Sequence, residues 1–156
     1  MIEVIKRHLA NLSASNWSDY KADLASNAVY EELSTRQRVT GADEYVKVVQ
    51  KWKRAFPDLK AKILHEVASG DIVVAEVEWE GTHTGPFEGP FGTIAATNKK
   101  GRVQGVLVFT MKNGKIIENH HYFDLMTVLT QLGIAPMAGT TAQPAAIAGA
   151  PAPRHP

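Results

Sequence analysis

The chain has 156 residues and a net charge of +1, which gives no electrostatic reason to expect nucleic acid or an anionic membrane as a partner. It contains no cysteine, which excludes disulfide bonds, thiolate catalysis and cysteine metal sites. This length and a hydrophobic content of 44% predict one domain with a hydrophobic core. The first residues lack the apolar core of a signal peptide, and no stretch approaches the ~20 apolar residues that span a bilayer, so we expect a cytoplasmic protein.

Three helices and one short strand are predicted in the first 56 residues. Apolar side chains recur every three or four positions in residues 2–12 and again in residues 40–56, which indicates amphipathic helices. A further helix is expected at 17–25, followed by a short strand at 28–33. Tyr30 and Glu32 share one face of this strand because side chains alternate between faces. The apolar stripe of the third helix includes Trp52 and Phe56, which is typical of core residues and would also suit a pocket wall.

After Pro57 the chain turns to β-structure, with strands predicted at 59–69, 72–83, 103–111 and 115–123. Residues 72–83 alternate apolar side chains, Trp79 among them, with a row of glutamates, which predicts one buried and one solvated face. The loop at 81–92 is rich in glycine and proline and contains His83; it either covers a pocket or connects two strands. Residues 103–111, which include Phe109, are almost continuously apolar and indicate a central strand.

The functional interpretation depends on Asp124, between the last strand and a short helix that starts at Leu125. Asp124, Tyr122 and His120 are expected on one face of the strand. A carboxylate, a phenol and an imidazole together suit a pocket for proton transfer. Aspartate is also a favoured helix N-cap, and the two roles can coexist. His120 and the next histidine face opposite sides, so joint metal ligation with His83 is unfavourable and we expect no metal site.

Helices come first and hairpin-connected strands follow, which predicts an α+β fold. We expect a cone-shaped, curved, mixed or antiparallel sheet wrapped around the N-terminal helices, with a pocket in the open mouth. This domain spans residues 1–135. Residues 136–156 are rich in proline and alanine and are expected to be a flexible tail. An open sheet face with apolar residues predicts a homodimer, or a higher homo-oligomer, formed through the sheet.

Five segments in this order resemble the SnoaL-like polyketide cyclases, which share the nuclear-transport-factor-like cone fold of ketosteroid isomerase. They are AFPDL at 55–59, the turn at 70–71, WEGTHTG at 79–85, the hairpin NGKI at 113–116, and the ending FD…QLG at 123–133. The resemblance covers residues 1–135. It implies intramolecular aldol ring closure of an aromatic polyketide methyl ester without a metal or organic cofactor. A His-Trp pair common in the family is replaced by Asn119 and His120, and the loop at 93–100 also departs from the family.

The resemblance places the acid/base group at Asp124. We expect burial to raise its pKa toward the working pH, where one carboxylate can remove a proton beside a carbonyl and return it to the new alkoxide. His120 and Tyr122 would donate hydrogen bonds to substrate oxygens. His83, in the loop at 81–92, is a secondary candidate for the site. The expected aromatic walls around a hydrophobic or aromatic substrate are Trp52, Phe56, Trp79 and Phe109.

Two other kinds of function remain open. The same fold hosts isomerases and epoxide hydrolases, and Tyr30, Glu32 and Asp124 are the residues that would surround one carbonyl in an isomerase. Alternatively, the domain binds an apolar ligand or serves as a dimerisation module without catalysis.

Overall fold

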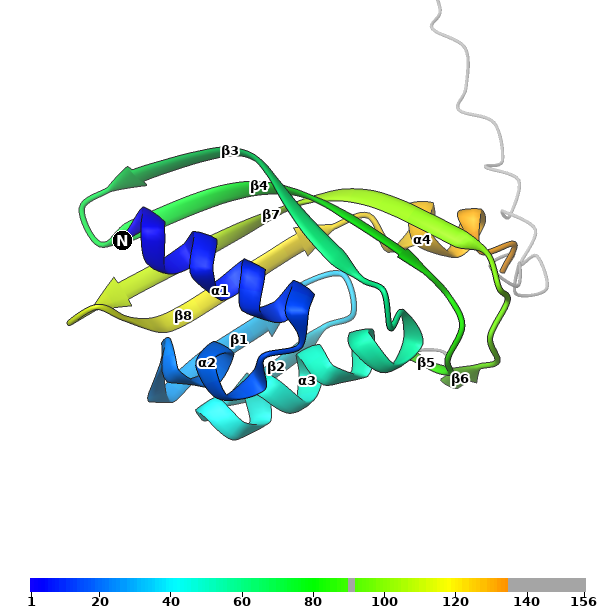
Figure 1. Ribbon diagram of the computed structural model, residues 1–156, viewed down its shortest axis with the longest axis horizontal. Helices are drawn as coiled ribbons and strands as arrows, with labels where there is room; N and C mark the ends of the chain where they lie inside the picture. Colours follow the sequence, from blue (N-terminus) through cyan, green and yellow to red (C-terminus); the bar gives the residue numbers. More distant parts are fainter. Residues whose placement is uncertain (90–91, 135–156) are drawn as a thin grey trace, which may run out of the picture.

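The computed structural model describes residues 1–89 and 92–134, and the predicted tail at 136–156 lies outside the described residues. Short connections join most of the helices and strands (Figure 1). In chain order they are α1 (Ile2–Ala14), α2 (Trp17–Ala22), β1 (Leu24–Glu32), β2 (Gln37–Thr40), α3 (Ala42–Ala55), β3 (Lys60–Ser69), β4 (Ile72–Thr82), β5 (Phe87–Gly89), β6 (Gly92–Ile94), β7 (Lys100–Lys112), β8 (Lys115–Phe123) and α4 (Leu125–Gln131).

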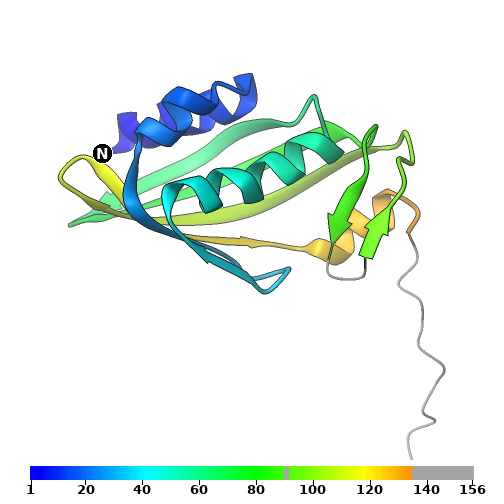
Figure 2. The same cartoon turned by 90° about the horizontal axis from the view of Figure 1, so that it is seen from below.

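Six strands form one mixed sheet in the order β2-β1-β8-β7-β4-β3. Strands β1 and β8 are parallel, and the other neighbouring pairs are antiparallel. The sheet is curved, and α1, α2 and α3 lie on its inner side (Figures 1 and 2). The predicted α+β class, with N-terminal helices against a curved mixed sheet, is therefore confirmed. No helix in the described part of the chain is long and apolar enough to cross a membrane.

Three elements differ from the sequence prediction. Strand β1 starts four residues earlier, at Leu24, and its pairing with β8 shifts register between Leu24 and Val29. Strand β2 was not expected, because its four residues, QRVT, are mostly polar and too few for a clear alternation. The loop predicted at 81–92 contains β5, which pairs with β6 in a small separate sheet.

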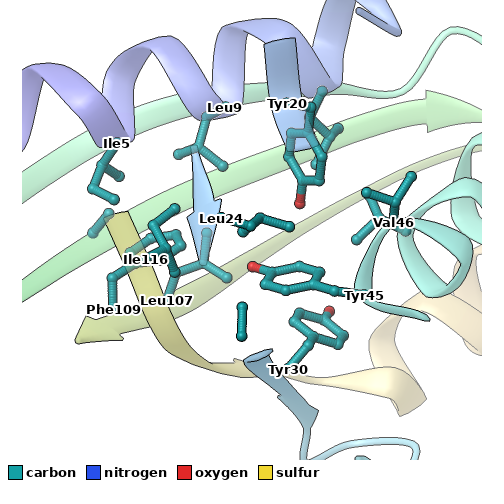
Figure 3. Packing of buried hydrophobic residues seen from close by; sticks show 14 of the residues in the cluster. Ile5, Leu9, Tyr20, Leu24, Tyr30, Tyr45, Val46, Leu107, Phe109 and Ile116 are labelled. Carbon is teal, nitrogen blue, oxygen red and sulfur yellow. The ribbon is translucent and has the colours of Figure 1, made fainter. Parts of the chain in front are cut away.

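The main core lies between the helices and the inner face of the sheet (Figure 3). On β4, alternate residues from Val73 to Trp79 are at most 8% exposed, so the predicted alternation is confirmed. The inward face of β7 contributes Leu107 and Phe109, and α3 contributes Tyr45. Burial of a large apolar side chain stabilises a fold by about 1.5–3 kcal/mol, so these inward faces fix the position of the helices against the sheet.

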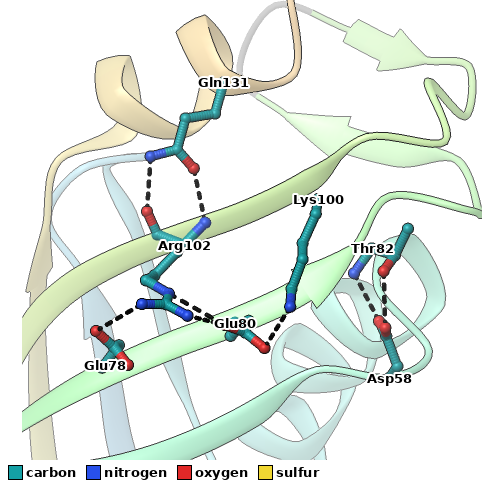
Figure 4. A network of polar contacts seen from close by, with 7 residues as sticks. All are labelled: Asp58, Glu78, Glu80, Thr82, Lys100, Arg102 and Gln131. Carbon is teal, nitrogen blue, oxygen red and sulfur yellow. Dashed lines mark hydrogen bonds and ion pairs between the residues drawn. The ribbon is translucent and has the colours of Figure 1, made fainter.

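Helix α4 closes one end of the sheet. Its apolar side packs with Phe56 and Phe87 in a second cluster. The side-chain amide of Gln131 accepts a hydrogen bond from the backbone nitrogen of Arg102 (2.6 Å) and donates one to its carbonyl oxygen (2.8 Å) (Figure 4). Strand β8 ends at Phe123, opposite Gly105 of β7, so Gln131 pairs with the backbone of β7 just beyond the last residue of β8. This contact holds α4 against the sheet.

The outer face of β4 and β7 carries ion pairs. Glu80 pairs with Lys100 (2.8 Å) and Arg102 (2.5 Å), and Glu78 lies 3.9 Å from Arg102 (Figure 4). This is the solvated face that the glutamate row predicts.

Candidate active site

An apolar cavity of about 70 Å³ lies between the inner face of the sheet and the helices. The four residues expected to form aromatic walls, Trp52, Phe56, Trp79 and Phe109, all line it. Tyr30 of β1 lines it too. The helical stripe of α3 and the inward faces of β4 and β7 therefore converge on one cavity.

The face of β8 that lines this cavity is the opposite of the one predicted. Asn119, His121 and Phe123 line the cavity, whereas Asp124 is exposed and lies outside it. The Asp124 carboxylate caps α4: Oδ1 accepts from the backbone nitrogen of Met126 (2.9 Å) and Oδ2 from Oγ1 of Thr127 (2.6 Å). The hydrogen bond from Thr127 and those from the backbone hold the pKa of Asp124 below its usual value. The expected pocket position and raised pKa of Asp124 are therefore wrong, and its structural role as a cap is what the geometry shows.

Three other predicted site residues also lie away from the cavity. Nε2 of His120 is 3.1 Å from Glu118 on the outer face, and Tyr122 is 42% exposed there. His83 is fully buried but does not line the cavity. Its Nδ1 accepts a hydrogen bond from the backbone nitrogen of Thr97 (3.2 Å) and so ties the segment before β7 to the end of β4. These positions make His83 a structural residue and leave His120 and Tyr122 facing solvent.

The face of β8 was misassigned for a physical reason. A shift of one residue moves every side chain of a strand to the other face, and polarity does not distinguish the faces of β8 because both carry polar groups. The register also changes near Ile117, since Thr110 pairs with Glu118 but Met111 pairs with Ile116. Ile116 and Asn119 are both buried although they are three positions apart, an odd spacing that regular alternation would place on opposite faces. The inward position of His121 is therefore visible only once β8 is paired.

Two residues that line the cavity, Tyr30 and His121, form a buried network with Glu32. The Tyr30 hydroxyl donates to Oε2 of Glu32 (2.8 Å) and lies 3.0 Å from Nδ1 of His121. Oε2 also accepts from Nε1 of Trp52 (2.8 Å), and Oε1 accepts from Thr35 (2.6 Å). Glu32 is 1% exposed. Strand pairing creates this network, because Glu32 of β1 and His121 of β8 are partners in the parallel ladder.

The network selects one tautomer of the neutral His121 ring. The Tyr30 proton is directed at Glu32, so the Tyr30 oxygen must accept the hydrogen bond from Nδ1, which therefore carries the proton. In this tautomer of the neutral ring, the lone pair lies on Nε2. This nitrogen is buried, and no side chain or backbone group in the described residues bonds to it. A Cβ atom at Gly105 would lie 3.4 Å from this nitrogen, so the glycine keeps the space beside Nε2 free.

Glu32 carries the negative charge of this network. Burial opposes ionisation of this carboxyl, but the neighbouring His121 and the hydrogen bonds from Thr35 and Tyr30 outweigh it and keep the pKa of Glu32 below its ordinary value. Burial first, and then the charge of Glu32, raises the pKa of Tyr30 well above 10. Glu32 is therefore an anion and Tyr30 a neutral phenol at neutral pH.

Trp79 adds a hydrogen-bond donor beside His121. The two ring centroids are 5.5 Å apart, and Nε1 of Trp79 is buried without an acceptor among the described residues. The cavity wall thus contains the imidazole of His121 and, on a ring whose centroid is 5.5 Å away, an N–H without an acceptor in the described residues. Removal of a proton next to a carbonyl needs a base and a hydrogen-bond donor of these kinds. The part of the chain that the structure describes contains no group of three or more His, Asp or Glu side chains that could hold a metal ion.

The curved sheet, the three helices on its inner side and the enclosed cavity define a ketosteroid-isomerase-like fold. Within this class, the chain belongs to the SnoaL-like polyketide cyclase family, whose model matches residues 2–132. No functionally curated protein matches the chain.

Solved structures agree on the fold. A protein from Jannaschia sp. CCS1 assigned as a SnoaL-like polyketide cyclase has a TM-score of 0.77 at 22% identity, over 86% of this chain and 92% of that one. A Catenulispora acidiphila protein with a ketosteroid isomerase-like fold has a TM-score of 0.73 at 17% identity, over 85% and 93%. An LEH-like epoxide hydrolase of M. tuberculosis has a TM-score of 0.65 at 19% identity, over 84% and 87%.

Proposed function

We propose that this protein is an acid/base enzyme that closes a ring of an aromatic polyketide ester by intramolecular aldol condensation, with His121 as the group that transfers the proton. The observation that carries the proposal is the hydrogen-bond chain from His121 through Tyr30 to Glu32, which in the neutral imidazole places the lone pair on Nε2 of a residue that lines an apolar cavity. His121 takes the role that the sequence assigned to Asp124. Membership of the SnoaL-like family supports the aldol class of reaction. The network of His121, Tyr30 and Glu32 supports the choice of His121 as the base.

The steps follow from the positions of the groups. Nε2 of His121 removes a proton from the carbon next to a substrate carbonyl, and the C–H electron pair forms the enolate, whose oxygen accepts a hydrogen bond from Nε1 of Trp79. The positive charge on His121 is stabilised by the Glu32 carboxylate, 3.8 Å from Nδ1. The enolate carbon then attacks a second carbonyl of the same molecule, and the new alkoxide takes the proton back from His121. The cycle restores the starting state of the protein.

The size of the cavity limits which part of the substrate it encloses. A second, more polar cleft of about 480 Å³, lined by Thr35, Lys51 and Phe87, lies on the other side of Glu32 and Trp52. Trp52 lines both spaces. Ligand sites for molecules of this class have volumes of roughly 300–1,000 Å³. We therefore place the reacting carbons in the apolar cavity and the remainder of the substrate in the cleft, which requires Trp52 to move aside.

The test is ring closure of an aromatic polyketide methyl ester by the wild type and three variants. We expect turnover by the wild type and its loss in His121→Phe, because phenylalanine keeps the ring among Trp79 and Phe123 but has no lone pair. His120→Phe is the matched control, since it removes the neighbouring histidine from the outer face. Asp124→Asn retains a good helix cap and should also keep its activity.

The outcomes separate the alternatives. Loss of activity in Asp124→Asn, with His121→Phe active, would refute the proposed base. If no variant or wild type closes the ring, exchange of the α-hydrogens of 4-hydroxyacetophenone in D₂O measures proton removal alone. Exchange that depends on His121 would then favour an isomerase. Absence of exchange in the wild type would refute acid/base catalysis in this cavity.

A further inference from the structure

The cavity has a second polar end, formed by His8 of α1 and Asn119 of β8. Asn119 precedes His121 by two residues on the inward face, which places it about 7 Å away along the strand. Phe109 is the ladder partner of Asn119, and its ring centroid is 6.1 Å from that of His8. His8 and Asn119 therefore both lie close to Phe109, and His121 lies one step further along β8, where its ring centroid is 5.5 Å from that of Trp79. We call His8 and Asn119 the inner polar end.

His8 presents a hydrogen-bond acceptor at this end. It is 1% exposed, lines the cavity and stacks on Tyr20 with ring centroids 3.8 Å apart. Its Nδ1 lies 3.5 Å from Oδ2 of Asp23, whose other oxygen is bound by Arg7. The carboxylate favours the tautomer whose Nδ1–H faces it, so Nε2 keeps its lone pair. Within the described residues, neither ring nitrogen of His8 has a hydrogen-bond partner.

Asn119 presents a second acceptor. Its Nδ2 donates to the Tyr45 hydroxyl (2.6 Å), which directs the amide oxygen away from that contact. Asn119 is 3% exposed, and its Oδ1 has no partner in residues 1–89 and 92–134. A buried acceptor without a donor is costly, and two of them close to Phe109 in an apolar cavity indicate that a donor comes from the ligand.

We propose that the inner polar end binds a hydroxyl group of the substrate, so that the substrate is a phenolic or enolic ketone whose hydroxyl lies on the side away from the reacting carbonyl. The assignment of the carbonyl to Trp79 rests on the proposed function, whereas the hydroxyl site rests on the two unpaired acceptors. The two ends are complementary in kind: Trp79 offers a donor to a carbonyl oxygen, and His8 and Asn119 offer acceptors to an O–H.

Three ligands of one shape test this proposal by isothermal titration calorimetry: 4-hydroxyacetophenone, 4-methoxyacetophenone, which cannot donate, and acetophenone. We expect the wild type to bind the hydroxyl compound at least about fivefold more tightly than either of the others, as one hydrogen bond would give. His8→Phe should reduce this preference to less than about twofold while it keeps the stacking on Tyr20. The matched control is His65→Phe on the exposed side of β3, which should keep the full preference.

A second variant and a second readout make the result decisive. If His8→Phe does not fold, Asn119→Leu on β8 carries the same expectation. A wild type that binds all three ligands equally, or a preference that survives in both variants, would overturn the proposal. His121→Phe should keep the hydroxyl preference and lose α-hydrogen exchange. Preference without exchange in the wild type would therefore remove the proposed function alone, and exchange without preference would remove the hydroxyl site alone.

Discussion

Replacement of Glu32 by glutamine tests the charge behind His121 without a change in shape. Oε2 accepts hydrogen bonds from Tyr30 and Trp52, and Oε1 accepts one from Thr35. A glutamine with its carbonyl oxygen in the position of Oε2 keeps the first two bonds, and its NH₂ group can donate to the Thr35 hydroxyl. We therefore expect Glu32→Gln to fold, so that the lost negative charge is the main change in the cavity wall.

The magnitude follows from the distance between the charges. Oε2 of Glu32 is 3.8 Å from Nδ1 of His121, and unit charges at this separation attract by about 4 kcal/mol at an effective dielectric constant of about 20. His121 gains its charge as it accepts the substrate proton. A fully formed charge in the transition state would make the loss of Glu32 cost about 1,000-fold in rate, and a half-formed charge roughly 30-fold.

The assay is exchange of the α-hydrogens of 4-hydroxyacetophenone in D₂O, followed by proton NMR at saturating ligand. We expect Glu32→Gln to slow exchange within the range of about 30- to 1,000-fold while the dissociation constant changes little. Glu31→Gln is the control, because Glu31 is adjacent in sequence but lies on the outer face, paired with Arg38 (2.5 Å). Exchange by folded Glu32→Gln within about threefold of the wild type would refute the role of this charge.

Three further predictions concern stability and assembly. Burial lowers the pKa of His8 below its ordinary value of 6.5, so the neutral ring stabilises the fold fully above that pH, and this stabilisation is lost as the pH falls. His8→Phe should therefore lose less thermal stability than the wild type between pH 7.5 and 5.5, measured by circular dichroism. Equal losses in the two proteins would contradict this prediction. Gln131→Ala removes both hydrogen bonds to Arg102 and should lower the free energy of urea unfolding by about 1–2 kcal/mol, whereas Thr130→Ala should leave it unchanged. We expect a homodimer through the outer face of the sheet, so Tyr122→Glu, at a side chain 42% exposed, should shift the gel-filtration mass from two chains to one; a wild-type mass of one chain would end this expectation.

Periodicity predicted the parts of the fold in which burial repeats regularly. The stripe of α3 and the alternation of β4 each gave the inward residues correctly, and with them the aromatic walls Trp52 and Trp79. The stripe of α1 also contained His8, which stands at helical spacing with Ile5 and Leu12. A histidine on an apolar stripe is thus the sequence signal for the inner polar end, but the same pattern is also typical of a histidine in a packed core, so it does not by itself predict a binding group.

The sequence alone could not show which face of β8 points into the cavity. The strand is polar on both faces, and its register irregularity near Ile117 breaks the alternation on which a phase assignment depends. Its partner on one side is β1, in parallel pairing, and more than 80 residues separate the two strands. Such a pairing has no local turn that would reveal it. The contact between Glu32 and His121 therefore emerges only from the tertiary structure.

The pairing of β1 and β8 places two glutamate–histidine pairs side by side on opposite faces of one sheet. Glu32 pairs with His121, and Glu31 with His120, in consecutive register positions. The distances are nearly equal, 3.8 Å inside and 3.7 Å outside. Both members of the outer pair are 33% exposed, whereas the inner members are 1% and 11% exposed. Water screens the outer pair, and only the inner pair has Tyr30 to fix a tautomer and a cavity for the free nitrogen. Burial, and not residue type or spacing, is therefore what favours the inner pair for the proposed proton transfer.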